Sequence, residues 1–306
     1  MPWRSASNGP EARGVRLSSF NERIDEALGV IGRLAAFGAA TLAVVFFSGI
    51  ALKPVFPAGV PPGLEGRILV ALIITFAVTV AHVIVVAMLE RADWTLSGFH
   101  SSAWHPGALA LGLAAGAIAV ALPGALLFWS GQLTSVSSTT GDWLPFALGT
   151  LGVFAALAAV EELAFRGYPF GLLADRWGGG IAIGVTSVAF AVLHAFNPGA
   201  TAVSLLCVGA AGLFLGAVRL ATGSVVAAWL AHVAINWVQA VVFRLPVSGI
   251  ELRVAPGFRL ESTGPDWLTG GRWGLEGGVA TAGVLLVISF LLFRARPTDT
   301  GRAHRR

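Results

Sequence analysis

The chain has 306 residues, of which 56% are hydrophobic and only 12% are charged, and its 20 basic and 16 acidic side chains give a net charge of +4. Soluble domains carry about 25% charged residues, so this composition excludes a soluble globular protein and predicts a polytopic α-helical membrane protein. The positive charge gathers in the two tails, which indicates membrane orientation, and we expect no nucleic-acid partner.

Apolar runs long enough to cross a bilayer recur along the chain. A transmembrane helix needs about 20 residues, so we predict an all-α fold, a bundle of about eight transmembrane helices. We place these helices near residues 31–52, 68–89, 107–129, 143–176, 180–196, 200–219, 222–244 and 278–293. Gly112 and Gly116 have the four-residue spacing that lets two helices approach closely in lipid.

The ends of the chain differ from this apolar domain. We predict a disordered cytoplasmic tail at 1–27, a membrane domain at 28–293 with its candidate catalytic core at 140–245, and a basic cytoplasmic tail at 294–306. Arginines concentrate in both tails, and positive charge marks the cytoplasmic side. The sequence therefore predicts a plasma (inner) membrane protein with both termini in the cytoplasm and an even number of spans.

Ionisable residues interrupt three of the apolar runs. Such groups are costly inside a bilayer and usually have a function. The fourth span contains Glu161, Glu162 and Arg166, the fifth contains Phe190 and His194, and the seventh contains His232 and Asn236. Two carboxylates, two imidazoles and an amide are the side chains of a hydrolytic site, so this set is our candidate functional site.

Helix geometry predicts which of these side chains meet. We expect the fourth span to continue as one helix to about Arg176, and a turn at Gly178 to lead into the fifth span. Glu161 and His194 then both lie roughly 25 Å from that turn, at 1.5 Å per residue. The two side chains can therefore meet, and His232 can join them in one intramembrane pocket.

Helical spacing also assigns faces to the adjacent glutamates. Residues four apart share a face, so Glu162 is expected to form an ion pair with Arg166, and His232 and Asn236 point the same way. Glu161 is rotated about 100° from Glu162 and faces another neighbour. We therefore expect Glu162 to support the structure and Glu161 to act on water.

The three motifs resemble those of the CAAX protease and bacteriocin-processing family of intramembrane proteases, also called CPBP or Abi. They are Glu-Glu-x-x-x-Arg at 161–166, Phe-x-x-x-His at 190–194 and His-x-x-x-Asn at 232–236. The chain continues after Arg166 with Gly-Tyr-Pro-Phe, as family members frequently do. Each motif alone is weak, but the three together on successive membrane helices are specific, and the resemblance covers about 140–245.

This resemblance implies peptide-bond hydrolysis by a glutamate-activated water, without a cofactor. Glu161 would be the general base, assisted by His194, and His232 with Asn236 would stabilise the oxyanion. Glu162, Arg166 and Phe190 would support these groups. The expected partners are the lipid bilayer and a peptide or membrane-protein substrate, with or without a lipid modification.

Two alternatives stay open. Glu161, His194 and His232 are also a plausible zinc ligand set, although the chain has no His-Glu-x-x-His motif. A non-enzymatic role, as a bacteriocin-immunity protein or membrane partner, would retain the fold without hydrolysis. A transporter is expected to have inverted repeats and broken helices, and the sequence indicates neither.

Overall fold

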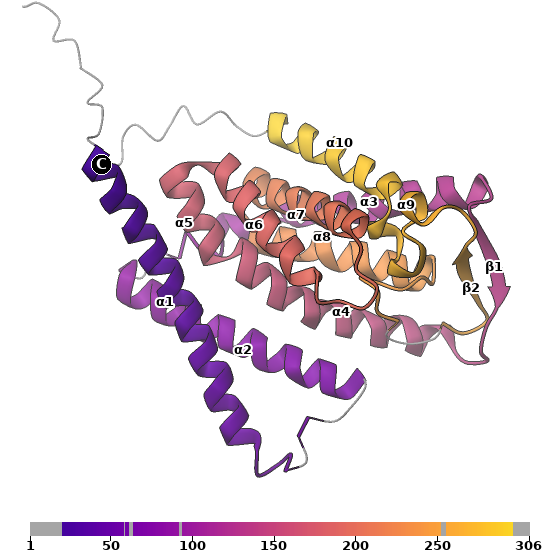
Figure 1. Ribbon diagram of the computed structural model, residues 1–306, viewed down its shortest axis with the longest axis horizontal. Coiled ribbons are helices and arrows are strands. Elements are labelled where there is room, and N and C mark those ends of the chain that lie inside the picture. Colours follow the sequence, from indigo (N-terminus) through magenta and orange to yellow (C-terminus); the bar gives the residue numbers. More distant parts are fainter. Residues whose placement is uncertain (1–19, 58, 61–63, 92–93, 252–254, 296–306) are drawn as a thin grey trace, which may run out of the picture.

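The structure is a computed structural model that describes residues 20–57, 59–60, 64–91, 94–251 and 255–295. About 75% of the chain is helical, which confirms the all-α class. Figure 1 shows the central helices side by side in one bundle, with α1 crossing its left-hand end steeply. The helices are α1 (Phe20–Leu52), α2 (Leu64–Leu89), α3 (Pro106–Trp129), α4 (Trp143–Arg166), α5 (Tyr168–Trp177), α6 (Gly179–His194), α7 (Ala202–Thr222), α8 (Val225–Trp237), α9 (Asp266–Thr269) and α10 (Val279–Ala295).

Six helical segments of the described residues are long and apolar enough to cross a membrane, and α6 and α10 are shorter apolar helices. All eight lie where the sequence predicted a span, so the chain is an integral membrane protein. That each of the eight crosses the bilayer stays a prediction. The six long segments are Ile24–Leu52, Ile68–Leu89, Pro106–Trp129, Trp143–Trp177, Ala202–Thr222 and Val225–Val242.

The first helix begins earlier than predicted. Residues from Phe20 onward are helical, so the end of the predicted tail 1–27 is not disordered. Glu and Arg, which are strong helix formers, occur in this stretch, and Glu22 lies in the first turn, where the helix dipole favours an acid. The remainder of both predicted tails, 1–19 and 296–306, lies outside the described residues.

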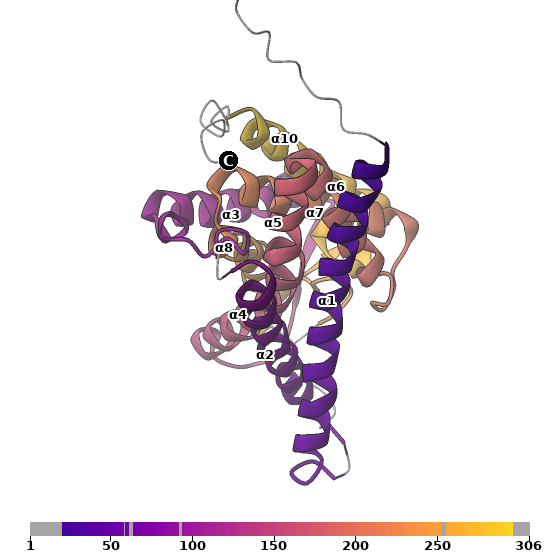
Figure 2. The same ribbon diagram turned by 90° about the vertical axis from the view of Figure 1, so that its left-hand side faces the viewer.

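Helix α1 lies at the side of the bundle, next to α2 (Figure 2). Its side chains Leu42, Phe46 and Phe47 are each more than 60% exposed. Large exposed apolar surface of this kind marks contact with a membrane. We infer that α1 faces lipid and contributes little to the site.

The predicted long helix 143–176 is broken at Gly167 into α4 and α5. Pro169, in the first turn of α5, has no amide hydrogen to continue the hydrogen-bond ladder of α4. A Cβ at Gly167 would lie 2.3 Å from His82 Nε2, so only glycine fits against that ring. The sequence prediction of one continuous helix to about Arg176 was wrong, because the chain leaves helical geometry at Gly167 and Pro169 cannot donate the next hydrogen bond.

Side chains from other helices satisfy the polar groups that the break leaves. The buried ring of His82 donates from Nδ1 to the Val78 carbonyl at 2.7 Å and accepts at Nε2 from the Tyr168 amide at 2.9 Å. Arg219 of α7 donates from Nε to the Arg166 carbonyl at 2.9 Å. The end of α4 and the start of α5 are thus each fixed by a hydrogen bond from another helix.

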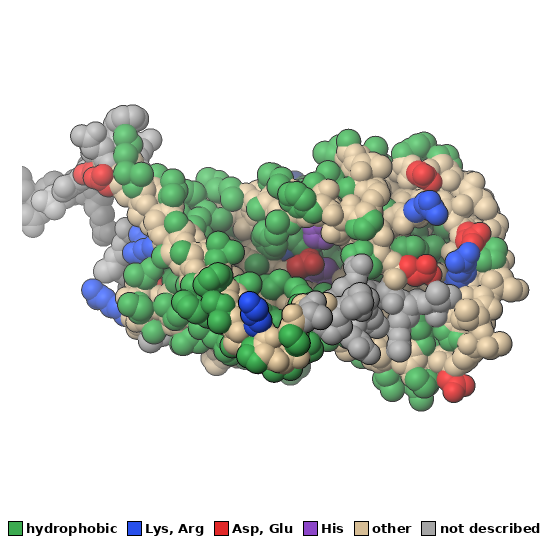
Figure 3. Space-filling view, turned by 60° about the horizontal axis from the view of Figure 1, so that its bottom comes forward, with side chains coloured by type: hydrophobic (Ala, Val, Ile, Leu, Met, Phe, Trp, Pro, Cys, Tyr) green, Lys and Arg blue, Asp and Glu red, His purple; other side chains and the backbone are tan. Residues whose placement is uncertain are grey.

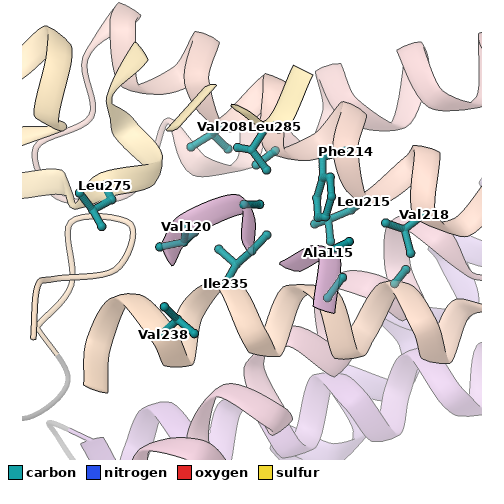
Figure 4. Packing of buried hydrophobic residues seen from close by; sticks show 14 of the residues in the cluster. Ala115, Val120, Val208, Phe214, Leu215, Val218, Ile235, Val238, Leu275 and Leu285 are labelled. Carbon is teal, nitrogen blue, oxygen red and sulfur yellow. The ribbon is translucent and has the colours of Figure 1, made fainter. Parts of the chain in front are cut away.

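A close approach between α3 and α8 fixes the helix that carries His232. A Cβ on Gly112 would lie 2.2 Å from the Ala227 carbonyl oxygen, and one on Gly116 would lie 2.2 Å from that of Ala231. Only glycine fits at such distances, so the glycine spacing predicted helix packing correctly. The largest buried cluster lies beside this contact and includes Ala115, Val120, Phe214, Ile235 and Leu285 (Figure 4).

Two segments that the sequence indicated only as loops form a small sheet at the right-hand end of the bundle (Figure 1). Strand β1 (Leu133–Ser137) pairs antiparallel with β2 (Phe258–Ser262), and Leu133 lies opposite Ser262. Helix α8 continues into a π-helical turn, Val238–Val242, before the chain reaches β2. Short 3₁₀ turns, among them Leu275–Gly277, then lead back to α10. The long segment 245–277 is therefore ordered against the end of the bundle over its described residues.

Candidate functional site

Glu161 and Glu162 lie next to each other in α4 but in different surroundings. The Glu161 side chain is 31% exposed and the Glu162 side chain is 1% exposed. Consecutive side chains of a helix point about 100° apart. Glu161 therefore faces the cavity, whereas Glu162 faces the protein interior. The different faces that helical spacing predicted are present.

Two imidazoles face the carboxylate of Glu161. Its Oε2 atom lies 3.9 Å from Nε2 of His194 and 3.8 Å from Nε2 of His232. Both distances exceed that of a direct hydrogen bond. The three predicted residues therefore converge, and His232 approaches Glu161 as closely as His194 does.

The far side of each imidazole ring is held by an oxygen atom. His194 Nδ1 lies 2.8 Å from the Phe190 carbonyl oxygen, which only accepts, so Nδ1 carries the hydrogen. His232 Nδ1 lies 2.8 Å from Glu162 Oε1. Since a carboxylate accepts, this ring also donates from Nδ1. Both rings are thereby oriented with Nε2 toward Glu161.

Glu162 joins the site to a buried cation. Its Oε1 atom lies 3.4 Å from Arg166 Nη1, and both side chains are fully buried. The predicted pairing of these two residues is therefore present, although 3.4 Å is long for a hydrogen bond between charged groups. The same oxygen receives the hydrogen bond from His232. This second contact, which sequence spacing did not predict, makes Glu162 the direct neighbour of a candidate catalytic residue.

Phe190 and Arg166 pack together behind the two histidines. The Arg166 guanidinium lies 4.5 Å from the centre of the Phe190 ring, in cation–π geometry. The Phe190 ring is centred 4.4 Å from that of His194 and 6.0 Å from that of His232. Arg166 also donates from Nη2 to the Gly212 carbonyl at 3.1 Å. Phe190 therefore sits against both imidazoles, as a supporting residue would.

A cavity of about 210 Å³ opens in front of Glu161. It has room for several water molecules or a short stretch of polypeptide. Figure 3 shows acidic and histidine side chains at the bottom of a hollow in an otherwise mainly apolar and neutral surface. Asn236, four residues after His232 on α8, is largely buried and lines the same cavity. The polar side chains of the lining are Glu161, His194, Asn197, His232, Asn236 and Ser248.

Two of these lining residues, Asn197 and Ser248, were missed from the sequence. Asn197 follows His194 by three residues, about one helical turn, so its spacing was a usable signal. Ser248 belongs to the long segment after α8 and has no motif around it. Its place in the cavity depends on how that segment folds back onto the bundle.

The zinc alternative requires Glu161, His194 and His232 to bind one ion at about 2.0–2.2 Å. The atom types suit zinc, and an oxygen on each Nδ1 is common in zinc sites. Within the described ranges, however, no group of three or more His, Cys, Asp and Glu side chains is arranged to hold a metal ion. The zinc alternative stays a prediction.

Comparison with known proteins gives one match. The family model for type II CAAX prenyl endopeptidases, Rce1-like, matches residues 142–238. No curated protein and no solved structure matches the chain. The matched segment runs from the start of α4 to the end of α8 and contains Glu161, His194, His232 and Asn236. The resemblance drawn from the three motifs is thus confirmed over this segment, which is similar to the Rce1-like CAAX protease family.

Proposed function

We propose that this protein is an intramembrane endopeptidase that hydrolyses a peptide bond with a water molecule activated by Glu161. One observation carries the proposal: the partly exposed Glu161 side chain lies at the wall of a cavity, with its Oε2 atom 3.8–3.9 Å from two imidazole nitrogens. A water bound there contacts a base and has a substrate carbonyl within reach. The match to the Rce1-like family supports the same reaction class.

In the proposed reaction Glu161 accepts a proton from the water as its oxygen attacks the substrate carbonyl. The carbonyl π electrons move to oxygen and form a tetrahedral oxyanion. Asn236 and an imidazolium form of His232, held by Glu162 on Nδ1, donate hydrogen bonds to that oxyanion. The C–N bond then breaks, and the proton taken up by Glu161 passes, with help from His194, to the leaving amine.

The substrate that fits this site is a peptide or the end of a membrane protein that reaches into the bilayer. The family description names prenyl endopeptidases, so a C-terminal peptide with a prenylated cysteine is the substrate to test first. The cavity is lined by apolar residues as well as by the polar site, among them Phe154, Leu157 and Leu193. These residues suit a substrate with apolar side chains next to the cleaved bond.

The substrate can be identified by comparing membrane peptides from cells that carry wild type or Glu161→Gln. We expect a C-terminal or juxtamembrane fragment that the variant alone fails to produce. Glu261→Gln is the matched control, because Glu261 is exposed and paired with Arg259 in β2, far along the chain from the motifs. A phenotype retained in Glu161→Gln, with no fragment lost, would favour the non-enzymatic partner role.

We further propose that both tails are cytoplasmic. Figure 1 shows the start of α1 and the end of α10 directed toward the same end of the bundle, where α5 lies. Cysteines placed at 1–25 and at 298–306 on a Cys207→Ser background should then react only from the cytoplasm. Those placed at 130–142 should react only from outside. Reaction of both sets from one side would overturn this orientation.

A further inference from the structure

A short stretch of chain separates the catalytic cavity from a larger one. We call residues 245–251 the wall segment. Val247, Ser248 and Ile250 line the catalytic cavity, whereas Leu245, Pro246, Gly249 and Glu251 line a polar cavity of about 590 Å³. The loop after α6 divides in the same way, since Asn197 faces the first cavity and its neighbours Pro198 and Gly199 face the second.

Ser248 is the point where the wall segment is fixed. Its carbonyl accepts a hydrogen bond from Asn197 Nδ2 at 3.1 Å, which joins the wall segment to the loop after His194. Its backbone φ is +50°, in the left-handed region that is unfavourable for a residue with a side chain. Surrounding contacts must therefore hold this conformation in place.

Glu276 supplies those contacts. Its carboxylate Oε1 accepts hydrogen bonds from the Ser248 amide and from the Ser248 hydroxyl, the latter at 3.2 Å. Glu276 is 4% exposed and its own amide donates to Gln239 Oε1 at 3.2 Å. Gln239 in turn donates from Nε2 to the Pro246 carbonyl at 2.5 Å. The two residues together hold both ends of the turn in the wall segment.

The proposed peptide hydrolysis does not use this buried carboxylate. Glu276 does not line the catalytic cavity, and in the part of the chain that the structure describes no cation is paired with it. Its Oε2 atom is buried and has no hydrogen-bond partner among the described residues. Burial of a carboxylate without a cation lowers the stability of the fold. Its presence at this position therefore indicates a function.

We propose that Glu276 is a positioning residue that fixes Ser248, and with it the wall segment, so that the catalytic cavity holds the substrate chain against Glu161. This inference rests on the proposed peptidase function. It assigns to the segment after α8 a part in substrate binding, although none of the three sequence motifs extends there. Loss of the Glu276 contacts frees the wall segment and weakens substrate binding more than it slows the chemical step.

The test compares Glu276→Ala with Glu276→Gln in the purified full-length chain. Alanine removes the acceptor for Ser248, whereas the glutamine oxygen keeps an acceptor of the same reach without the charge. Glu261→Gln is the control, because it makes the same change at an exposed residue of the larger cavity. Cleavage of a farnesylated CAAX peptide gives kcat and KM, and amide hydrogen exchange of residues 244–251 reports on the wall segment without any turnover.

We expect Glu276→Ala to raise KM and the exchange rate of the Ser248 region each about tenfold, as loss of a buried hydrogen bond predicts, with a smaller change in kcat. In Glu276→Gln both KM and the exchange rate should be close to the wild-type values, and Glu261→Gln should match the wild type. If Glu276→Ala yields little folded protein, Glu276→Asp repeats the test, because its shorter side chain withdraws the carboxylate from Ser248.

Wild-type values of KM and exchange in Glu276→Ala would overturn the proposal, as would a glutamine variant that is as impaired as the alanine variant. A wild-type protein that fails to cleave the peptide would count against the proposed function instead. In that case the exchange rates still decide whether Glu276 holds the wall segment.

Discussion

Glu161 and Glu162 lie on two faces of α4, about 100° apart around the helix axis, and the two faces differ in function: one is proposed to carry out the chemistry and the other supports it. On the cavity face, the Glu161 carboxylate lies 3.8–3.9 Å from the Nε2 atoms of two imidazoles, and no arginine or lysine of the described residues forms an ion pair with it. On the buried face, Glu162 contacts both Arg166 and His232 through one oxygen. The first arrangement leaves a carboxylate able to take up a proton, and the second fixes a charge in place. The comparison predicts different consequences for substitutions on each face.

The largest effect on stability is expected on the buried face. Glu162→Ala leaves Arg166 buried without its carboxylate, which should lower the free energy of unfolding by about 3–5 kcal/mol. The amount of folded protein in membranes and its thermal stability in detergent measure this loss. Glu161→Ala is the matched control, since it makes the same change one residue away on the cavity face. Equal loss of stability in both variants would contradict the separation of the two faces.

On the cavity face the effect should fall on turnover. Asn236→Ala removes a proposed donor to the oxyanion, which should lower kcat by about 10²–10³ with a smaller effect on KM. Asn197→Ala changes another asparagine of the same cavity, one that holds the wall segment through Ser248. We expect this second variant to change KM more than kcat. If Asn236→Ala changed mainly KM and Asn197→Ala changed mainly kcat, the roles assigned to the two asparagines would be wrong.

Glu276 is a second buried carboxylate, and the pH dependence of stability distinguishes it from Glu162. Unlike Glu162, Glu276 has no paired cation in the described chain, and burial raises the pKa of its carboxyl from 4.5 to about 7. A raised carboxyl pKa means that the folded state binds the proton more tightly than the unfolded state.

The stability that Glu276 contributes is therefore complete below about pH 4.5, falls as pH rises, and is lost above about pH 7. We expect the free energy of unfolding of the wild type to fall by about 2–3 kcal/mol between these two pH values. The Glu276→Gln variant, which has no carboxyl at this position, should not show this fall. Thermal unfolding of the two proteins from about pH 5 to about pH 8 measures the difference. Parallel curves would show that Glu276 is not buried as described.

Much of this molecule could be predicted from its sequence. Apolar run length predicted the position of every long helix, and a rise of about 1.5 Å per residue brought Glu161 and His194 to matched depth. The contact between Glu162 and His232 could not be predicted, because the rotation of α8 relative to α4 depends on packing, including the glycine contact with α3. Helical periodicity fixes faces within one helix and not between helices.

The irregular parts were the least predictable. The pairing of β1 with β2 and the contact between Glu276 and Ser248 join residues far apart in sequence, without periodicity or motif. The break at Gly167 had a local signal in Pro169, but the contact with His82 that fills it comes from another helix. Tertiary contacts decide these features, so only the folded chain reveals them.

The central claim is that Glu161 activates water for peptide-bond hydrolysis without a metal ion. The most direct measurement is the initial rate at which chelator-treated, purified protein cleaves a farnesylated CAAX peptide, for wild type and Glu161→Gln. We predict that the treated wild type cleaves the peptide and that the variant, equally folded, is slower by about 10²–10⁴. A variant that keeps more than about a tenth of the wild-type rate, or a wild type silenced by the chelator and restored by zinc, would contradict the claim.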